Sequence, residues 1–228
     1  MNSNRRKPVI VFDVNETLLD MAPLKTNINT LLEEPQAFRI WFGMVLHYSL
    51  VENCTDQYHD FSTIAEAVLK MSAASLNKTV SDEDMKKALS AIKSLKAYPD
   101  VEKGLTLLKE NGFRLATLTN SPENALKEQL INSNLTDHFE QALSINAIEK
   151  YKPLAETYLW AAKKLGVKPE EIIMIAAHGW DLAGATNAGL AIGFIAREGQ
   201  SLYTLSKKPD FEASDILEMA EKLVATYK

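Results

Sequence analysis

Several polar side chains come directly after apolar segments, and they are the residues from which chemistry is expected. Asp13 follows the apolar residues 9–12. A carboxylate in that position either caps a turn or acts as a nucleophile that forms a covalent intermediate. A buried carboxylate stays ionised only beside a cation and hydrogen-bond donors. Lys152, between Tyr151 and Pro153, is the candidate cation, so these residues allow covalent catalysis by Asp13.

The segments around these residues predict an α/β protein. Residues 9–12 are apolar and β-branched and are bounded by Pro8 and Asp13, which is typical of a buried strand. Further strands are expected at 114–119, 141–145, 172–176 and 191–195. Helices are expected at 101–111, from the turn at 120–122 to about 132, and at 155–165, 182–188 and 215–227. Strands that alternate with helices of this length indicate a parallel sheet covered on both faces.

The stretch between the first two strands has a different composition. In residues 24–96 Gly43 is the only glycine, while Leu, Ala, Met, Lys and Glu dominate. Residues 81–84 resemble a helix start with acidic residues in its first turn. We therefore expect about four helices here, forming an insert that lies over the sheet as a lid or cap.

Composition limits the classes of function. The 228 residues are 46% hydrophobic and 24% charged, as in ordinary globular proteins. The net charge of −5 argues against nucleic acid as the main partner. No apolar run approaches the ~18 residues that span a membrane, and residues 9–12 are fewer than the ~7–15 of a signal peptide. We therefore expect no membrane partner. Cys54 is the only cysteine, so no internal disulfide can form, and we expect a cytoplasmic protein.

Ligands of a parallel sheet bind beyond the carboxyl ends of its strands. Candidate residues follow four of the predicted strands. In chain order they are Asp13, Asn15, Glu16 and Thr17, then Thr119 and Asn120, then Lys152, and finally His178, Trp180 and Asp181. Any one of these residues is a weak signal, but together they predict a single polar site, in which Thr17, Thr119 and Asn120 supply hydrogen bonds to Asp13.

These motifs resemble a known family. FDVNETL at 12–18, TNSP at 119–122, YKP at 151–153 and WD at 180–181 occur in the order of the haloacid dehalogenase-like superfamily. Its L-2-haloacid dehalogenase branch is also similar at YHDF, residues 58–61, and in the spacing from Lys152 to Tyr158. The resemblance covers nearly the whole chain. It implies a Rossmann-like parallel-sheet core of residues 1–20 and 97–228, an inserted helical cap domain of residues 21–96, and an active site between them.

The resemblance also implies a reaction. Asp13 would attack carbon 2 of a short L-2-haloacid, release halide and form an ester, which water would hydrolyse to a D-2-hydroxyacid. The magnesium phosphatases of the superfamily carry aspartates where Asn15 and Ala177 stand here, and Mg²⁺ prefers carboxylate ligands. We therefore expect no metal and no cofactor. A magnesium-dependent small-molecule phosphatase and a non-catalytic binding member are the alternatives.

Departures from the branch suggest how water is activated. Glu16 replaces a usual glycine, His178 a usual asparagine and Ala176 a usual serine, while Phe42 aligns with the halide-binding arginine. Imidazole titrates near neutral pH, and a carboxylate beside it fixes its tautomer. The hypothesis is that His178 deprotonates water and that Glu16 orients His178, as in a subgroup with such a pair.

The remaining expectations concern contacts with the substrate. The halide would rest against Phe42, Phe61 and the amide of Asn120. Arg39, one turn before Phe42, either compensates for the missing arginine or is a solvated charge. Asp181 would contact Lys152 or Asn120. The other residues expected to contact substrate are Thr119, Ser121 through its backbone N–H, Trp180 as a pocket wall, Val45 and Asn15. A homodimer is possible.

Overall fold

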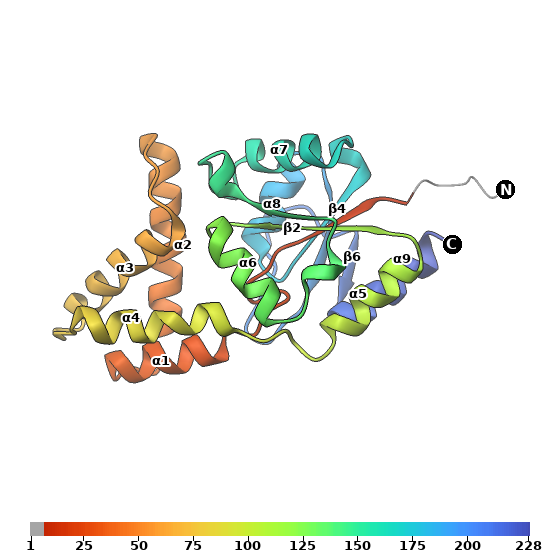
Figure 1. Ribbon diagram of the computed structural model, residues 1–228. Helices are drawn as coiled ribbons and strands as arrows, with labels where there is room; N and C mark the ends of the chain where they lie inside the picture. The colour runs from red at the N-terminus through yellow and green to blue at the C-terminus, as the bar shows by residue number, and fades with distance from the viewer. Residues whose placement is uncertain (1–6) are drawn as a thin grey trace.

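The computed structural model describes residues 7–228, so predictions for residues 1–6 lie outside it. The described part contains a six-stranded sheet of order β3-β2-β1-β4-β5-β6, and every neighbouring pair is parallel. The strands are β1 (Val9–Phe12), β2 (Arg114–Thr119), β3 (Gln141–Ser144), β4 (Ile172–Ala176), β5 (Ala191–Ile195) and β6 (Phe211–Ala213). The predicted α/β class is confirmed (Figure 1).

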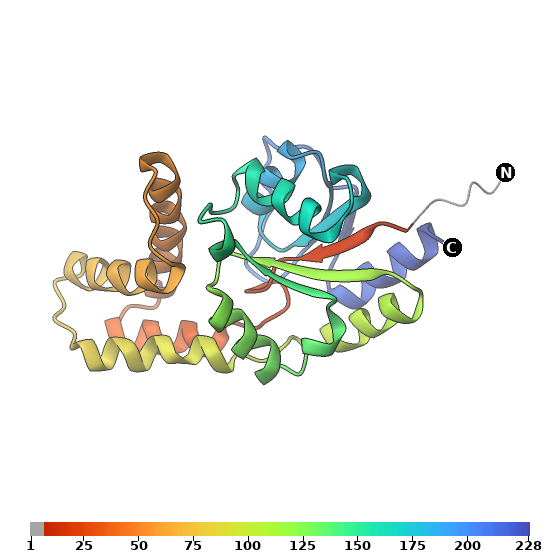
Figure 2. The ribbon, with the colours of Figure 1, turned by 45° about the horizontal axis from the view of Figure 1, so that its top comes forward.

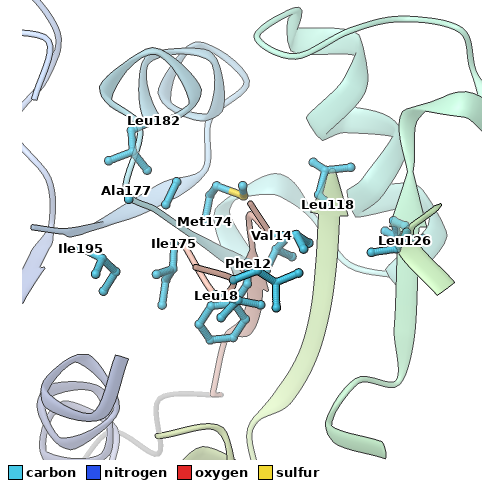
Figure 3. Packing of buried hydrophobic residues seen from close by; sticks show 14 of the residues in the cluster. Phe12, Val14, Leu18, Leu118, Leu126, Met174, Ile175, Ala177, Leu182 and Ile195 are labelled. Carbon is cyan, nitrogen blue, oxygen red and sulfur yellow. The ribbon is translucent and has the colours of Figure 1, made fainter. Parts of the chain in front are cut away.

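Strand β1 lies at the centre of the sheet. Val9 pairs with Arg114 of β2 on one side and with Ile172 of β4 on the other. All four residues of β1 are buried, as expected for a short, continuously apolar strand covered on both faces. Figure 3 shows Phe12 packed among residues of the neighbouring strands and loops, including Leu18 and Ile175. This central position brings the residue after Phe12 to the middle of one sheet edge.

Helices cover both faces of the sheet. Figures 1 and 2 show α7 (Ala155–Leu165) and α8 (Gly179–Asn187) on one face and α5 (Val101–Glu110), α6 (Glu123–Asn132) and α9 (Ile216–Thr226) on the other. Gly104 allows α5 to approach α9 closely, because a Cβ there would lie 2.7 Å from the carbonyl oxygen of Ile216. None of the helices within residues 7–228 is long and apolar enough to cross a bilayer.

The sequence predicted most elements within a few residues. β2, β4, β5 and α7 have the predicted bounds, and Gly166 ends α7 in the left-handed conformation. Strand β6 was missed, because three residues with a central Glu212 give no alternating apolar pattern. Helix α8 begins three residues earlier than predicted, at Gly179, so its first turn contains Trp180 and Asp181.

The insert contains the expected four helices. They are α1 (Ala22–Leu32), α2 (Ala37–Thr55), α3 (Phe61–Ser75) and α4 (Asp82–Ser90), followed by the 3₁₀ helix η1 (Ala91–Ser94). Ser81 caps α4 by accepting a hydrogen bond from the backbone N–H of Asp84. Figures 1 and 2 show these helices beyond the end of the sheet toward which β1 runs. The insert therefore stands at the edge where the candidate residues gather.

The chain enters and leaves the insert at one place. The backbone N–H of Asp20 donates to the carbonyl of Lys96, and that of Tyr98 donates to the carbonyl of Leu18. Because the two connections are paired, helices α1–α4 and η1 can pack as one unit on a double linker. We propose on this basis that residues 21–96 form a cap domain and that residues 7–20 and 97–228 form the core; the predicted core also included residues 1–6, which lie outside the described residues.

Candidate active site

Asp13 is held at the carboxyl end of β1. Its backbone N–H donates to the carbonyl of Ile175 over 2.9 Å, which continues the β1–β4 ladder by one residue. The carboxylate is 5% exposed. Its Oδ1 lies 2.8 Å from Lys152 Nζ, and its Oδ2 accepts from Thr17 Oγ1 over 2.8 Å. The sheet and these two donors therefore fix the direction of the carboxylate.

Lys152 is a buried cation between two carboxylates. Its Nζ lies 2.8 Å from Asp13 and 2.5 Å from Oδ2 of Asp181, and it donates to the carbonyl of Leu118 over 3.0 Å. Burial alone would lower the pKa of Lys152, but Asp13 and Asp181 outweigh it and raise that pKa. Burial likewise opposes the charge on Asp13, yet Lys152, and then His178, hold the pKa of Asp13 below its usual value. These two groups favour the ionised form of Asp13, the form in which a carboxylate can act as a nucleophile.

Asp181 completes the second side of this ion pair. Its Oδ1 accepts from the hydroxyl of Tyr158 over 2.6 Å, and its backbone carbonyl accepts from the same hydroxyl over 3.0 Å. Burial raises the pKa of Asp181, and the nearby negative charge of Asp13 adds to the effect, while Lys152 opposes it. The structure thus brings Asp181 to Lys152 and gives Tyr158 a polar contact. Asp13, Lys152, Asp181 and Tyr158 are called the lysine centre below.

The turn after Asp13 joins two strand ends. Thr17 Oγ1, which donates to Asp13, also accepts from the backbone N–H of Ala177 over 3.0 Å. Glu16 has a φ of +58°, a conformation that disfavours side chains with a Cβ and suits glycine. A costly conformation kept at the end of the central strand indicates that the Glu16 side chain has a function.

His178 stands on the other side of Asp13. Its Nε2 lies 3.7 Å from Asp13 Oδ2, 3.6 Å from Glu16 Oε2 and 3.3 Å from the carbonyl of Asn15. The ring is 5% exposed. Burial raises the pKa of Glu16, and Asp13 adds to this, while His178 opposes it. The predicted pair is therefore brought together, although Glu16 and His178 are slightly farther apart than hydrogen-bonded atoms.

Gln200 is a site residue that the sequence did not predict. Its Oε1 lies 3.2 Å from Nδ1 of His178, and its side chain also hydrogen-bonds Glu16. Gly179 permits this approach, because a Cβ there would lie 2.5 Å from the backbone nitrogen of Tyr203. The strand-end rule was applied to four strands but not to β5, whose following loop carries Gln200. His178, Glu16 and Gln200 are called the histidine group.

Aromatic rings enclose the site. The ring of Trp180 stacks on that of His178 with centroids 5.5 Å apart, and Lys152 Nζ lies 5.7 Å from the Trp180 ring. Phe42, from helix α2 of the insert, has its centroid 6.3 Å from that of His178. Phe61 lies 6.0 Å from Tyr151 by the same measure. Side chains from the insert and from the sheet edge therefore meet over Asp13.

The amide and hydroxyl residues lie in a second network. Asn15 Nδ2 donates to Ser121 Oγ over 3.1 Å, and Asn15 Oδ1 accepts from Gln129 over 3.0 Å. The backbone N–H of Ser121, expected to bind the substrate carboxylate, donates instead to Thr119 Oγ1 over 3.2 Å. Asn120 Oδ1 accepts from the backbone of Lys152, whereas its buried Nδ2 has no protein partner. The free donor of this network is therefore Asn120.

Two expected residues lie apart from the cluster. Arg39 is exposed on α2, and no contact described for its side chain reaches the site, so its place agrees with the solvated-charge alternative. Val45 is fully buried within the insert, among the apolar residues of its core. The spacing of one helical turn from Phe42 suggested Arg39, but such spacing does not show which side chains reach across to the sheet.

The donor set does not resemble a magnesium site. The positions at which carboxylates would be needed hold the amide of Asn15 and the methyl group of Ala177, and the ammonium of Lys152 stands between Asp13 and Asp181. A cation there would compete with a buried lysine for the same two carboxylates.

Comparison with known proteins identifies the family. A sequence model of the haloacid dehalogenase-like hydrolases matches residues 7–189. The chain belongs to this family. Relatives that it resembles include (S)-2-haloacid dehalogenase 4A of Burkholderia cepacia, which is 32% identical over an alignment of 195 positions that covers 83% of this chain and 83% of that protein. The (S)-2-haloacid dehalogenase of Pseudomonas putida is 25% identical and covers 94% of this chain and 96% of its own length.

The fold of the family is shared as well. The crystal structure of the L-2-haloacid dehalogenase RSc1362 superposes with a TM-score of 0.89 at 22% identity, covering 95% of this chain and 98% of that one. At this identity the likeness bears on the fold alone. It supports the parallel sheet with surrounding helices as the architecture of a haloacid dehalogenase-like hydrolase.

Proposed function

We propose that this hydrolase converts L-2-haloacids to D-2-hydroxyacids through an ester on Asp13, without a metal ion. The observation that carries the proposal is the ionised, oriented carboxylate of Asp13 between Lys152 and Thr17, with His178 close to its other oxygen. The names of the relatives supply the substrate class.

The first step is a displacement at carbon. A carboxylate oxygen of Asp13 attacks carbon 2 from the side opposite the halogen. The new C–O bond forms as the carbon–halogen bond breaks, and halide leaves with the bonding electron pair. The configuration inverts, which gives the D product from the L substrate. Halide is a good leaving group, so no general acid is required, and Asn15 can stand where a phosphatase needs an aspartate.

The second step is hydrolysis of the ester. His178 takes a proton from water, and the resulting hydroxide attacks the carbonyl carbon of Asp13. The intermediate expels the hydroxyacid oxygen, which takes the proton back from His178, and Asp13 loses its own proton to solvent. Glu16, 3.6 Å from Nε2, stabilises the imidazolium that forms between these events.

Gln200 serves as a positioning residue for this base. When its Oε1 accepts a hydrogen bond from Nδ1–H, the neutral imidazole carries its lone pair on Nε2, the nitrogen that faces Asp13 and Glu16. The side chain of Gln200 also hydrogen-bonds Glu16. One amide therefore fixes both the tautomer of the base and the carboxylate that assists it.

The remaining residues bind substrate and halide. Asn120 Nδ2, buried and without a protein partner, offers its N–H to the halide or to the substrate carboxylate. Lys152 supplies the positive charge, and Trp180, Phe42 and Phe61 form an apolar wall, with Thr119 and Ser121 at its polar edge. We place Asn15 as the support of Ser121.

We expect the protein to act in the cytoplasm, and a homodimer stays a prediction.

Halide release tests the function. We expect bromide from L-2-bromopropanoate but not from the D form, and no change with EDTA. If neither form released bromide, and the protein hydrolysed a phosphate ester only when Mg²⁺ was present, the phosphatase alternative would replace the proposal. Binding of haloacid without turnover would indicate the non-catalytic alternative.

Substitution of the base tests the two steps separately. His178→Ala should release about one equivalent of bromide and then stop, because Asp13 is esterified and not hydrolysed. Intact-protein and peptide mass spectrometry should locate the added mass on Asp13. Steady turnover by this variant with unmodified protein would remove His178 from the mechanism.

A further inference from the structure

A cavity between the insert and the sheet edge extends beyond the residues that the mechanism above assigns to the substrate. Its volume is about 200 Å³. The insert contributes most of its wall, and the turn after β1, the loop before α6 and the first turn of α6 contribute the rest. The apolar residues that line it include Met21, Trp41, Phe61, Leu89, Ile92 and Ala125. Glu66, Lys86 and Lys93 are the charged residues of the lining.

The cavity adjoins the reaction centre. Asn15 and Ser121, which are hydrogen-bonded to each other, belong to its lining. In the sequence, Asn15 lies two residues after Asp13, and Ser121 follows Asn120. Phe42 belongs to the lining too, and its ring packs beside His178. The cavity thus lies beside the residues around Asp13, and a substituent on a molecule bound at Asp13 would enter it past Asn15, Ser121 and Phe42.

Size and chemistry of the cavity favour a hydrocarbon. An apolar protein cavity of about 150 Å³ binds benzene, so a cavity of this size accepts about six carbon atoms. The methyl group of a 2-halopropanoate fills only a small part of that space. Each further methylene moved from water to apolar walls should strengthen binding about fourfold.

We propose that this cavity binds the hydrocarbon substituent on carbon 2 of the substrate, so that L-2-haloacids with an alkyl chain or phenyl ring of about six carbons are preferred over short ones. The proposal rests on the proposed function and changes its substrate class. The expectation from the sequence was a short acid, whereas Phe42 and Phe61 line a cavity with room for a longer substituent.

A chain-length series tests the proposal. For L-2-bromo acids from propanoate to octanoate, whose substituents on carbon 2 lengthen from methyl to hexyl, kcat/KM should rise about fourfold for each methylene. A flat or falling series would overturn the preference while leaving dehalogenation intact.

Binding of halogen-free acids keeps the test independent of chemistry. Hexanoate should raise the melting temperature at a lower concentration than propanoate does. This result would support the cavity even if no bromo acid were turned over, an outcome that would remove only the proposed reaction. Equal effects of the two acids would overturn the inference.

A matched pair of variants in α3 locates the chain. Ala65 lines the cavity and is 8% exposed, whereas Ala73 is 4% exposed and lies outside the lining. Ala65→Leu should reduce the ratio of kcat/KM for L-2-bromohexanoate to that for L-2-bromopropanoate by at least about fourfold, the effect of one excluded methylene. Ala73→Leu should leave that ratio unchanged. An unchanged ratio in Ala65→Leu, with both variants folded by circular dichroism, would place the chain elsewhere.

Discussion

The lysine centre and the histidine group both meet Asp13, but they are built differently. In the lysine centre the polar atoms are 2.5–2.8 Å apart, and Lys152 and Asp181 are almost completely buried. In the histidine group the separations from His178 to Glu16 and Gln200 are 3.6 and 3.2 Å, and the Glu16 side chain is 17% exposed.

The difference corresponds to the two proposed steps. Displacement needs a nucleophile that is ionised and aimed before substrate arrives, and a closed ion pair supplies this. Hydrolysis needs a base that admits a water molecule after the ester has formed, so its surroundings are more open. We therefore expect changes in the lysine centre to affect stability and both steps, and changes in the histidine group to affect hydrolysis alone.

Loss of Lys152 should have the largest effect. Lys152→Met leaves two buried carboxylates without their cation, which should destabilise the protein by about 3–5 kcal/mol. It should also lower bromide release about 10³-fold, because Asp13 loses the cation that keeps it ionised. Chemical denaturation and kinetics with L-2-bromopropanoate measure the two effects.

A neighbouring lysine serves as the control. Lys150 pairs with Asp56 at the surface, two residues before Lys152. Lys150→Met should leave both the unfolding midpoint and activity unchanged. Full activity of Lys152→Met would contradict the role of the lysine centre.

Mild acid should separate the two steps. The pKa of Glu16 is raised above 4.5 by burial, whereas Lys152 and His178 keep that of Asp13 below 3.8 against burial. As the pH falls, Glu16 therefore becomes neutral first and hydrolysis slows, while Asp13 remains a carboxylate and still attacks. Rapid-quench kinetics in mild acid should show a bromide burst of one equivalent with esterified enzyme, whereas equal loss of both steps would contradict the assignment.

Removal of Gln200 should have a moderate effect confined to hydrolysis. Gln200→Leu removes the acceptor at Nδ1 of His178, and loss of such an orienting partner commonly costs about tenfold or more. The variant should accumulate ester during turnover and retain the bromide burst, a result that mere loss of stability would not give. Gln141→Leu, which removes a surface glutamine bonded to the carbonyl of Lys164, should leave turnover unchanged and accumulate no ester. A Gln200→Leu variant without accumulated ester would remove its positioning role.

The sequence predicted the lysine centre better than the histidine group. Asp13, Lys152 and Asp181 follow regular strands or come from recognisable motifs, so topology alone brings them to one edge. Gln200 lies in an irregular loop that reaches His178 only because Gly179 leaves space, and no periodicity indicates such a contact. Whether Asn120 or Ser121 has an N–H free for the substrate also depends on three-dimensional neighbours. The backbone N–H of Ser121 donates to Thr119, whereas Nδ2 of Asn120 has no protein partner, so the structure favours Asn120 as the donor to the substrate.

Replacement of Glu16 by glycine should have a small and favourable effect on stability. Glu16→Gly relieves a φ of +58° and removes a partly buried carboxyl group, which together should stabilise the fold by about 1 kcal/mol. The hydrolysis step should slow at the same time. Glu33→Gly, at a φ of +48° far from the site, should leave turnover unchanged. Lower stability of Glu16→Gly would contradict the view that function maintains this conformation.

The origin of the product oxygen tests the central claim most directly. We would run a single turnover of L-2-bromopropanoate with excess enzyme in water labelled with oxygen-18. An ester on Asp13 predicts that the first hydroxyacid carries unlabelled oxygen from the carboxylate and that Asp13 gains the label. Labelled hydroxyacid with unlabelled Asp13 would show that water attacks carbon 2 directly, and Asp13 would not be the nucleophile.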